Sequence, residues 1–232
     1  MNYPQHLRTL ATSELETWIS RSLPTIVNRS LRTGLHGIWA KGDWAGLPAG
    51  PYILAANHHS WWDLYLIWRL RDRLKRTLTG FMDEETLEKF PFFRRQGVIS
   101  STEVRLALRR LARGDVLQIF PEGELRQAGQ VQEVEAGLSF LAHKAWVPVY
   151  PLAFRVVMRG AERPEAFIVL GERLEAENLP TCFTTAVNKL LTDIDAVVTL
   201  SNPEVPPEGF EAWGVSARRF DERLAWLKKV WS

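Results

Sequence analysis

The chain has 232 residues, of which 46% are hydrophobic and 24% charged, an ordinary globular composition that suffices for one large domain or two small ones. The formal net charge of +2 at pH 7 is too small to argue for a nucleic-acid partner, and none is expected. The single cysteine, Cys182, excludes an internal disulfide framework and fits a reducing compartment. The sequence shows no apolar run of the ~18 residues that a membrane span needs and no signal-peptide pattern, so we expect a cytoplasmic protein.

Residues 1–34 are predicted to form two amphipathic helices. Their apolar positions recur every three or four residues, and Pro24 is expected to break the run. Arginines are interspersed among the apolar positions: Arg8, Arg21, Arg29 and Arg32. Such a basic amphipathic pair either packs on the domain or lies on a membrane surface, and the sequence leaves both open.

Strands and helices alternate between residues 35 and 201, which predicts a single α/β domain with a central, mostly parallel or mixed sheet flanked by helices. Strands are expected at 35–39, 52–56, 78–82, 98–99, 116–120, 147–155 and 166–170, and helices after Asp63 and at 84–90, 103–112, 137–145 and 179–200. Pro148 and Pro151 predict an edge or bulged position for the strand at 147–155. Residues 202–232 are predicted to be a Pro-rich linker and a C-terminal amphipathic helix.

The stretch NHHSWWD, residues 57–63, lies between the apolar run at 52–56 and the helix that follows. On one continuous helix His58 and Asp63 would point about 140° apart, but they can meet if His58 is in the loop and Asp63 in the first turn. An imidazole held by a carboxylate is a usable general base. Alternatively, Ser60 and Asp63 form a helix-capping box, which would leave His58 as a polar loop residue. His59 is expected to be an ordinary loop histidine.

A second candidate segment follows the strand at 116–120. There Pro121 and Gly123 bracket Glu122 and would hold its carboxyl group at a fixed position. The sequence contains no G-x-S-x-G nucleophile motif, no glycine-rich phosphate loop, and no H-E-x-x-H or CxxC pattern. We therefore expect no metal and no cofactor.

These segments together resemble the glycerolipid acyltransferase family, whose best-known members are the lysophosphatidic acid acyltransferases. The family block N-H-x-S-x-x-D matches Asn57, His58, Ser60 and Asp63, and the block F-P-E-G matches Phe120, Pro121, Glu122 and Gly123. A further block, an apolar strand with proline, resembles residues 147–151, and the similarity covers roughly residues 36–156. The spacing of the first two blocks makes the resemblance quite specific.

The resemblance implies a mechanism and a set of site residues. His58, oriented by Asp63, would take a proton from a lipid hydroxyl, which then attacks the thioester of an acyl-CoA or an acyl carrier protein; general-base catalysis contributes about 10²- to 10⁴-fold. Backbone N–H groups near residues 57–63 are expected to stabilise the oxyanion. The resemblance assigns substrate binding to Asn57, Ser60, Glu122, Gly123, Arg126, Arg94 and Arg95. Its implied partners are the acyl donor thioester, the lipid acceptor and the surface of the cytoplasmic membrane, bound peripherally.

Three positions depart from the family pattern. Glu103, Leu125 and Glu135 stand where the family has cations that are linked with the acceptor's phosphate. An acid beside a phosphate is repulsive, so either a shifted arginine rebuilds the phosphate site (Arg94, Arg95, Arg105 or Arg126) or the acceptor is a neutral lipid alcohol. Two other activities stay open: a catalytically silent lipid-binding protein on the same fold, and a thioesterase in which water replaces the alcohol.

Overall fold

The computed structural model describes the backbone of residues 5–214 and the side chains of residues 17–214; the helix predicted near the C-terminus lies outside this range. Within it, the strands form one eight-stranded mixed sheet in the order β4-β3-β5-β2-β6-β7-β1-β8. The strands are β1 Gly37–Lys41, β2 Tyr52–Ala56, β3 Leu78–Met82, β4 Val98–Ser100, β5 Val116–Ile119, β6 Val149–Val157, β7 Glu165–Leu170 and β8 Glu211–Gly214. The predicted α/β class with helices on a mixed sheet is confirmed.

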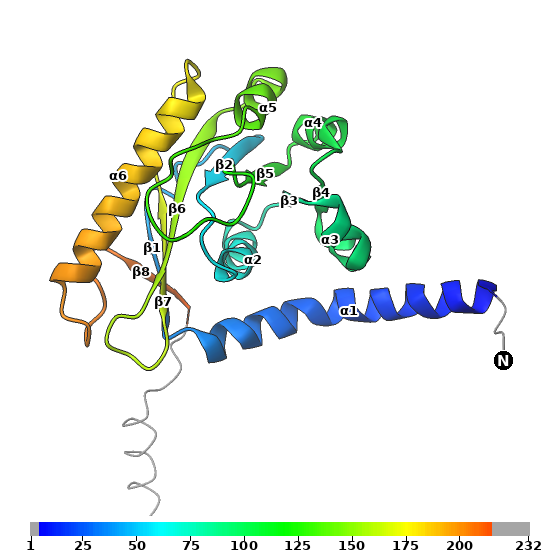
Figure 1. Ribbon diagram of the computed structural model, residues 1–232, viewed down its shortest axis with the longest axis horizontal. Coiled ribbons are helices and arrows are strands. Elements are labelled where there is room, and N and C mark those ends of the chain that lie inside the picture. Colours follow the sequence, from blue (N-terminus) through cyan, green and yellow to red (C-terminus); the bar gives the residue numbers. More distant parts are fainter. Residues whose placement is uncertain (1–4, 215–232) are drawn as a thin grey trace, which may run out of the picture.

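Helices cover both faces of the sheet (Figure 1). They are α1 Gln5–Gly34, α2 Trp62–Leu74, α3 Glu84–Lys89, the 3-10 helix η1 Pro91–Gln96, α4 Val104–Ala112, α5 Gly137–Ala145 and α6 Leu179–Leu200. Strand β2 shows how side chains divide between the two layers, since successive residues of a strand point to opposite faces. Leu54 packs in the core beneath α1 and α2, whereas its neighbours Ile53 and Ala55 pack in the core beneath α4, α5 and α6.

The predicted break at Pro24 is wrong, because α1 runs through Pro24 as one helix of 30 residues. A proline inside a helix leaves the carbonyl four residues earlier without its N–H donor. That carbonyl belongs to Ser20, and it accepts a hydrogen bond from Gln96 Nε2 of η1 at 3.0 Å. Val27 and Leu31 are buried in the core on the other side of the proline. Core packing of Val27 and Leu31 and the hydrogen bond from Gln96 therefore offset the helical hydrogen bond that Pro24 removes.

The predicted edge position of the strand at 147–155 is also wrong, because β6 lies inside the sheet between β2 and β7. Pro151 pairs with Ala55 of β2, while on its other side β7 ends at Leu170, opposite Leu152. The Pro151 carbonyl accepts from the Gly171 N–H at 2.9 Å. The missing N–H thus falls where the ladder with β7 has ended, so an interior strand can carry this proline.

Strand β8 was not predicted and extends the sheet beyond residue 201, the predicted end of the domain. It pairs antiparallel with β1, and its Trp213 is buried against Trp44, with ring centroids 4.5 Å apart. Arg69 of α2 donates to the Trp213 carbonyl, and Arg73 forms an ion pair with Glu211. The segment after α6 is therefore held by contacts with residues distant in the sequence. No local pattern in the sequence predicts this strand.

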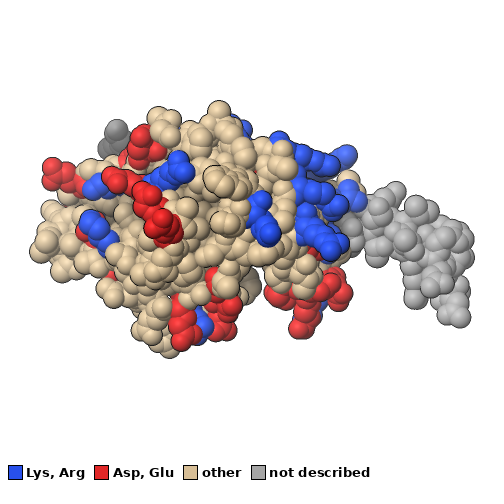
Figure 2. Space-filling model, turned by 90° about the horizontal axis from the view of Figure 1, so that it is seen from above, with Lys and Arg blue, Asp and Glu red and all other residues tan. Residues whose placement is uncertain are grey.

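The surface of the described residues is unevenly charged. Seen from above, Lys and Arg side chains gather on the right, on the side where α4 lies, with a group of acidic side chains just below them (Figure 2). None of the helices in the described range is both long and apolar enough to cross a bilayer.

Candidate active site

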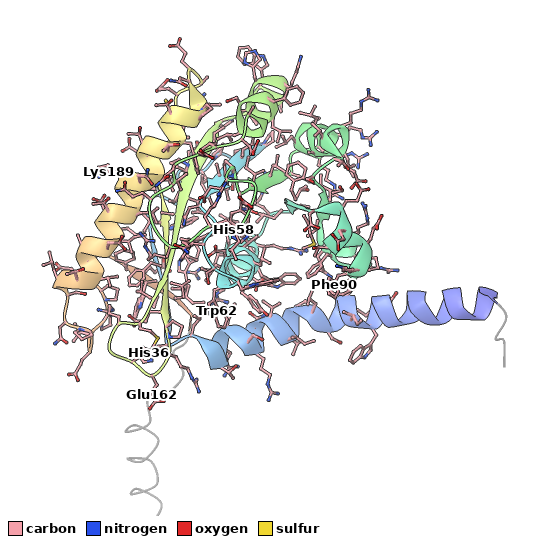
Figure 3. The ribbon with its side chains drawn as sticks, viewed as in Figure 1. His36, His58, Trp62, Phe90, Glu162 and Lys189 are labelled. Carbon is pink, nitrogen blue, oxygen red and sulfur yellow. The ribbon has the colours of Figure 1, made fainter. Side chains whose placement is uncertain are left out.

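The sheet topology brings the two candidate segments together. Strands β2 and β5 are neighbours and parallel, with Ala55 opposite Ile119. His58 and Glu122 each follow this pair by three residues, at the carboxyl ends of their strands, where open α/β sheets commonly bind ligands. His58 lies near the middle of the molecule, beyond the ribbon of α2 (Figure 3).

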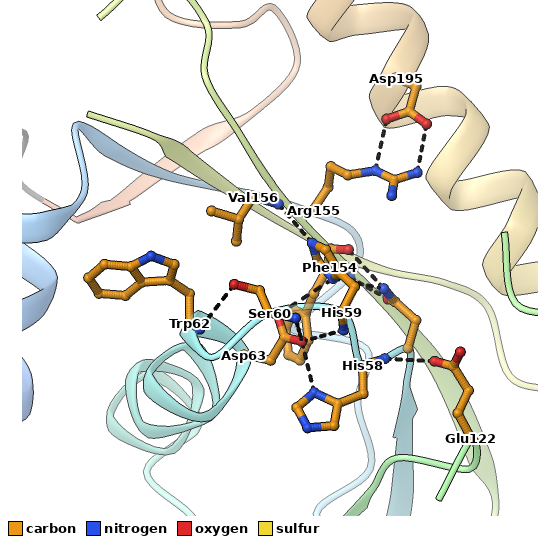
Figure 4. A network of polar contacts seen from close by, with 11 residues as sticks. His58, His59, Ser60, Trp62, Asp63, Glu122, Phe154, Arg155, Val156 and Asp195 are labelled. Carbon is orange, nitrogen blue, oxygen red and sulfur yellow. Dashed lines mark hydrogen bonds and ion pairs between the residues drawn. The ribbon is translucent and has the colours of Figure 1, made fainter. Parts of the chain in front are cut away.

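The side chains of His58 and Asp63 are in contact. Nδ1 of His58 lies 2.9 Å from Asp63 Oδ2 (Figure 4). Because a carboxylate only accepts hydrogen bonds, Nδ1 carries the proton and Nε2 presents a lone pair. The His58 ring is stacked on Phe120 at a centroid distance of 4.0 Å, and its side chain retains 17% exposure. The arrangement leaves Nε2 as the nitrogen that can take a proton from a substrate.

Asp63 also organises the backbone of the turn before α2. Besides His58 Nδ1, Asp63 Oδ2 accepts the backbone N–H of His59 at 2.8 Å and of Ser60 at 2.9 Å. Ser60 Oγ accepts from the Trp62 N–H at 3.2 Å. Capping and orientation of the imidazole are therefore not exclusive alternatives, since one carboxylate does both.

Asn57 and His59 attach the turn to β6. The Asn57 amide accepts from the Phe154 N–H and donates to the Phe154 carbonyl, at 2.8 and 3.0 Å. His59 Nε2 accepts from the Val156 N–H at 3.1 Å. Burial, the largest cause, lowers the pKa of His59, against the opposing effect of the Asp63 charge. His59 is thus a buried anchor rather than an ordinary loop histidine. The Asn57 amide holds the turn to β6, and its contact with substrate stays a prediction.

The turn after β5 holds His58 from the opposite side. Glu122 Oε1 accepts the His58 backbone N–H at 2.7 Å, and the Arg126 N–H donates to the His58 carbonyl at 2.9 Å. Gly123 has φ of +74°, and a Cβ there would lie 3.2 Å from Glu135 Cγ, so a side chain at this position would be strained. Burial raises the pKa of Glu122, although its hydrogen bond from His58 opposes the shift.

A large groove of about 1740 Å³ opens at His58. It runs between α3, η1, α4 and α5, and apolar side chains form much of its wall. These include Trp61, Leu64, Phe81, Phe90, Phe92, Phe93, Phe120, Leu125, Leu138, Phe140 and Leu141. A groove of this size and lining suits a long acyl chain.

The other predicted substrate residues are placed differently around the groove. Gly123 lines it, whereas Ser60, Glu122, Arg94, Arg95 and Arg126 do not. Two of these arginines are occupied by acids: Arg94 pairs with Glu103 at 2.7 Å, and Arg126 pairs with Glu124 at 2.9 Å. The acids Glu103 and Glu124 are the members of these pairs that line the groove.

Three of the backbone N–H groups in the turn at 57–63, where oxyanion donors are predicted, are already engaged. The backbone N–H of His58 is bonded to Glu122, and those of His59 and Ser60 are bonded to Asp63. These three amides are therefore not free, and an oxyanion donor elsewhere near the turn stays a prediction. The described side chains also include no cluster of three or more His, Cys, Asp or Glu residues suited to a metal ion.

Comparison with known proteins agrees with this geometry. The family model described as Acyltransferase matches residues 44–155, which include both candidate segments. The 1-acyl-sn-glycerophosphate (LPA) acyltransferase PlsC from Thermotoga maritima has the same fold, with a TM-score of 0.61 over 80% of this chain and 83% of that chain, at 18% sequence identity. A search of curated proteins gave no significant match.

The fold and the family match together define an O-acyltransferase. The acyltransferase match over residues 44–155 agrees with the motif resemblance to the glycerolipid acyltransferases, and the likeness to PlsC shows a shared fold.

We predict that Glu122 makes the free energy of unfolding depend on pH, and that the variant Glu122→Gln lacks this dependence. Its raised folded-state pKa means that the folded protein binds this proton more tightly than the unfolded chain. Stability from this group is therefore full below the unfolded pKa of roughly 4.3 and is lost as pH rises through the folded pKa. Urea unfolding of both proteins between pH 4 and 8 measures this. Relative to Glu122→Gln, the wild type should lose stability as pH rises, and parallel curves would contradict the assignment.

Proposed function

We propose that this protein transfers a fatty acyl group from a thioester to a lipid hydroxyl. The observation that carries the proposal is the His58–Asp63 pair: its Nδ1 is bound by the carboxylate, which leaves Nε2 to act as the base, and His58 lines a large, mostly apolar groove. The acyltransferase family match supports the reaction class. The groove supports a long-chain acyl donor because its wall presents aromatic and aliphatic side chains over most of its length.

The reaction needs one base and no covalent enzyme intermediate. Nε2 of His58 takes the hydroxyl proton while the oxygen attacks the thioester carbonyl, and the imidazolium that forms is stabilised by the adjacent Asp63 carboxylate. The tetrahedral intermediate collapses by breaking the C–S bond. His58 then returns its proton to the leaving sulfur, so the products are an ester and a free thiol, and His58 is again neutral.

The variant His58→Ala should lower acyl transfer by about 10²- to 10⁴-fold, because it removes the general base. Release of free thiol from a long-chain acyl-CoA, in the presence of lipid vesicles, measures the rate. His143→Ala is the matched control, since His143 is exposed on α5 and should leave the rate unchanged. Thermal unfolding of both variants shows whether the fold is kept.

The same assay separates the alternative functions. A folded His58→Ala variant with wild-type activity would sink the proposed role of His58. A wild-type protein that binds vesicles but releases no thiol with any acceptor would be a silent lipid-binding protein. Release of free fatty acid at one rate, with or without lipid acceptor, would identify a hydrolase.

We propose further that the acceptor is a lipid alcohol without a phosphate next to its hydroxyl. This proposal is supported by the charges along the groove that His58 lines, where the arginines of two ion pairs are held by Glu103 and Glu124. Leu125 contributes an apolar side chain to the same part of the groove. Beside these two pairs, a dianionic phosphate would approach carboxylates whose cations are already engaged, which is unfavourable. The two arginines that line the groove itself, Arg105 and Arg109, lie outside both pairs.

Thiol release should be faster with a neutral acceptor such as monoacylglycerol than with lysophosphatidic acid. Leu125→Arg should shift the preference toward lysophosphatidic acid, because it adds an unpaired cation to the groove wall; Leu125→Gln is the uncharged control. The ratio of kcat/KM for the two acceptors measures the preference. Faster turnover of lysophosphatidic acid by the wild type would overturn the proposal and indicate that a shifted arginine binds the phosphate.

The proposed acceptor is a lipid, and we propose that the protein reaches it by lying on a cytoplasmic membrane surface through α1. The face of α1 that is free of the domain combines apolar and basic side chains, as interfacial helices do. Trp18 is 63% and Ile26 48% exposed, and Arg21, Arg29 and Arg32 are exposed beside them. In Figure 1, the N-terminal part of α1 projects beyond the sheet and its other helices.

The double variant Trp18→Ser and Ile26→Ser should reduce sedimentation with anionic vesicles severalfold, because it removes exposed apolar area that would enter the interface. The control is Leu200→Ser, an equally simple loss of an exposed apolar side chain (84% exposed) at the end of α6. Equal sedimentation of the wild type and the double variant would show that α1 is not the anchor.

A further inference from the structure

Helix α4 and the residue that caps its C-terminus carry a row of exposed arginines. Arg105, Arg109 and Arg113 recur at intervals of four residues and are exposed, while Ala107 and Leu111 of the same helix are buried in the core. On a helix this spacing places the three side chains on one face. Helix α4 lies on the side of the molecule where Figure 2 shows basic side chains gathered. We call them the α4 arginine row.

The α4 arginine row differs from the other arginines around the groove in having no acidic partner. Arg94 and Arg126 are each within 3 Å of a glutamate, whereas no ion pair links any member of the row to another described residue. An exposed cation by itself is usually only solvated. Three neighbouring cations of one sign, however, raise the local potential and favour an anionic ligand.

The groove connects this row to the catalytic base. Arg105 and Arg109 line the same groove as His58, and Arg113 does not. A thioester bound with its carbonyl at His58 has two arms, the acyl chain and the thiol part that leaves. The apolar walls suit the acyl chain, and the two groove-lining arginines offer binding partners for an anionic thiol arm.

We propose that Arg105 and Arg109 bind the phosphates of the coenzyme A part of an acyl-CoA donor; this rests on the proposed acyl transfer. A guanidinium group binds phosphate oxygens through two parallel hydrogen bonds. Four residues of helix separate the two arginines by about 6 Å along the axis, so they can contact different phosphates of one ligand. Because both line a groove rather than a flat face, a small polyphosphate fits them better than a membrane surface or an acidic protein.

The test compares two donors that differ in the phosphate-bearing nucleotide. Palmitoyl-CoA and palmitoyl-pantetheine carry the same thioester, but the second lacks the nucleotide and its phosphates. The double variant Arg105→Gln and Arg109→Gln should raise the KM for palmitoyl-CoA by roughly tenfold, since each lost charge-assisted contact is worth only part of its buried value at an exposed site. The KM for palmitoyl-pantetheine and for the lipid acceptor should stay within a factor of about two.

Arg113→Gln is the matched control, because it removes the same charge from the same face of α4 outside the groove. It should change the KM for palmitoyl-CoA by less than about twofold. An equal rise of KM for both donors in the double variant, or none for either, would overturn the proposal. So would a double variant that loses vesicle sedimentation or acyl carrier protein turnover while its KM for palmitoyl-CoA is unchanged.

Calorimetric binding of free coenzyme A keeps this test independent of catalysis. Coenzyme A should bind the wild-type protein and the Arg113→Gln variant alike, and the double variant about tenfold more weakly. If the wild type turns over no donor, the proposed acyl transfer fails, but the binding measurement still decides the ligand of Arg105 and Arg109. Equal affinity of the wild type and the double variant would refute their assignment to coenzyme A.

Discussion

The site depends on one carboxylate oxygen, Asp63 Oδ2, which accepts three hydrogen bonds from the preceding turn. Two come from the backbone and one from the His58 imidazole, and Asp63 is fully buried. Hydrogen bonds to a charged acceptor contribute about 1.5–3 kcal/mol each. The base therefore cannot be oriented separately from the turn that carries it, and the loss of Asp63 would affect local folding and chemistry together.

The turn at residues 57–63 is itself held in place by contacts from β6 and from the segment after β5. Glu122 and Arg126, after β5, bond to the backbone of His58 on both sides, and Asn57 bonds to β6. These strands neighbour β2 in the sheet, so the register of the sheet sets the position of the base. This explains how a histidine in a loop can occupy a defined position at the mouth of a wide groove.

Local signals in the sequence predicted the α/β class, most of the element positions and the contact between His58 and Asp63. Features that depend on distant partners were missed. Pro24 suggests a helix break because the sequence does not show that Gln96, 72 residues later, bonds to Ser20. Pro151 suggests an edge strand because the sequence does not show where β7 ends. Likewise, nothing near Asn57 reveals that its amide is used on Phe154. The family motifs identify which residues gather, but not which of them face the groove.

The hydrogen bond beneath Pro24 links two parts of the molecule that otherwise do different things. Gln96 ends η1, whose Phe92 and Phe93 form part of the groove wall, and its partner carbonyl belongs to α1. Because Pro24 has no N–H, the Ser20 carbonyl of α1 is bonded instead to Gln96, in the segment that forms part of the groove wall. The position of the phenylalanines of η1 is therefore tied to the position of α1, although the two segments are far apart in the sequence.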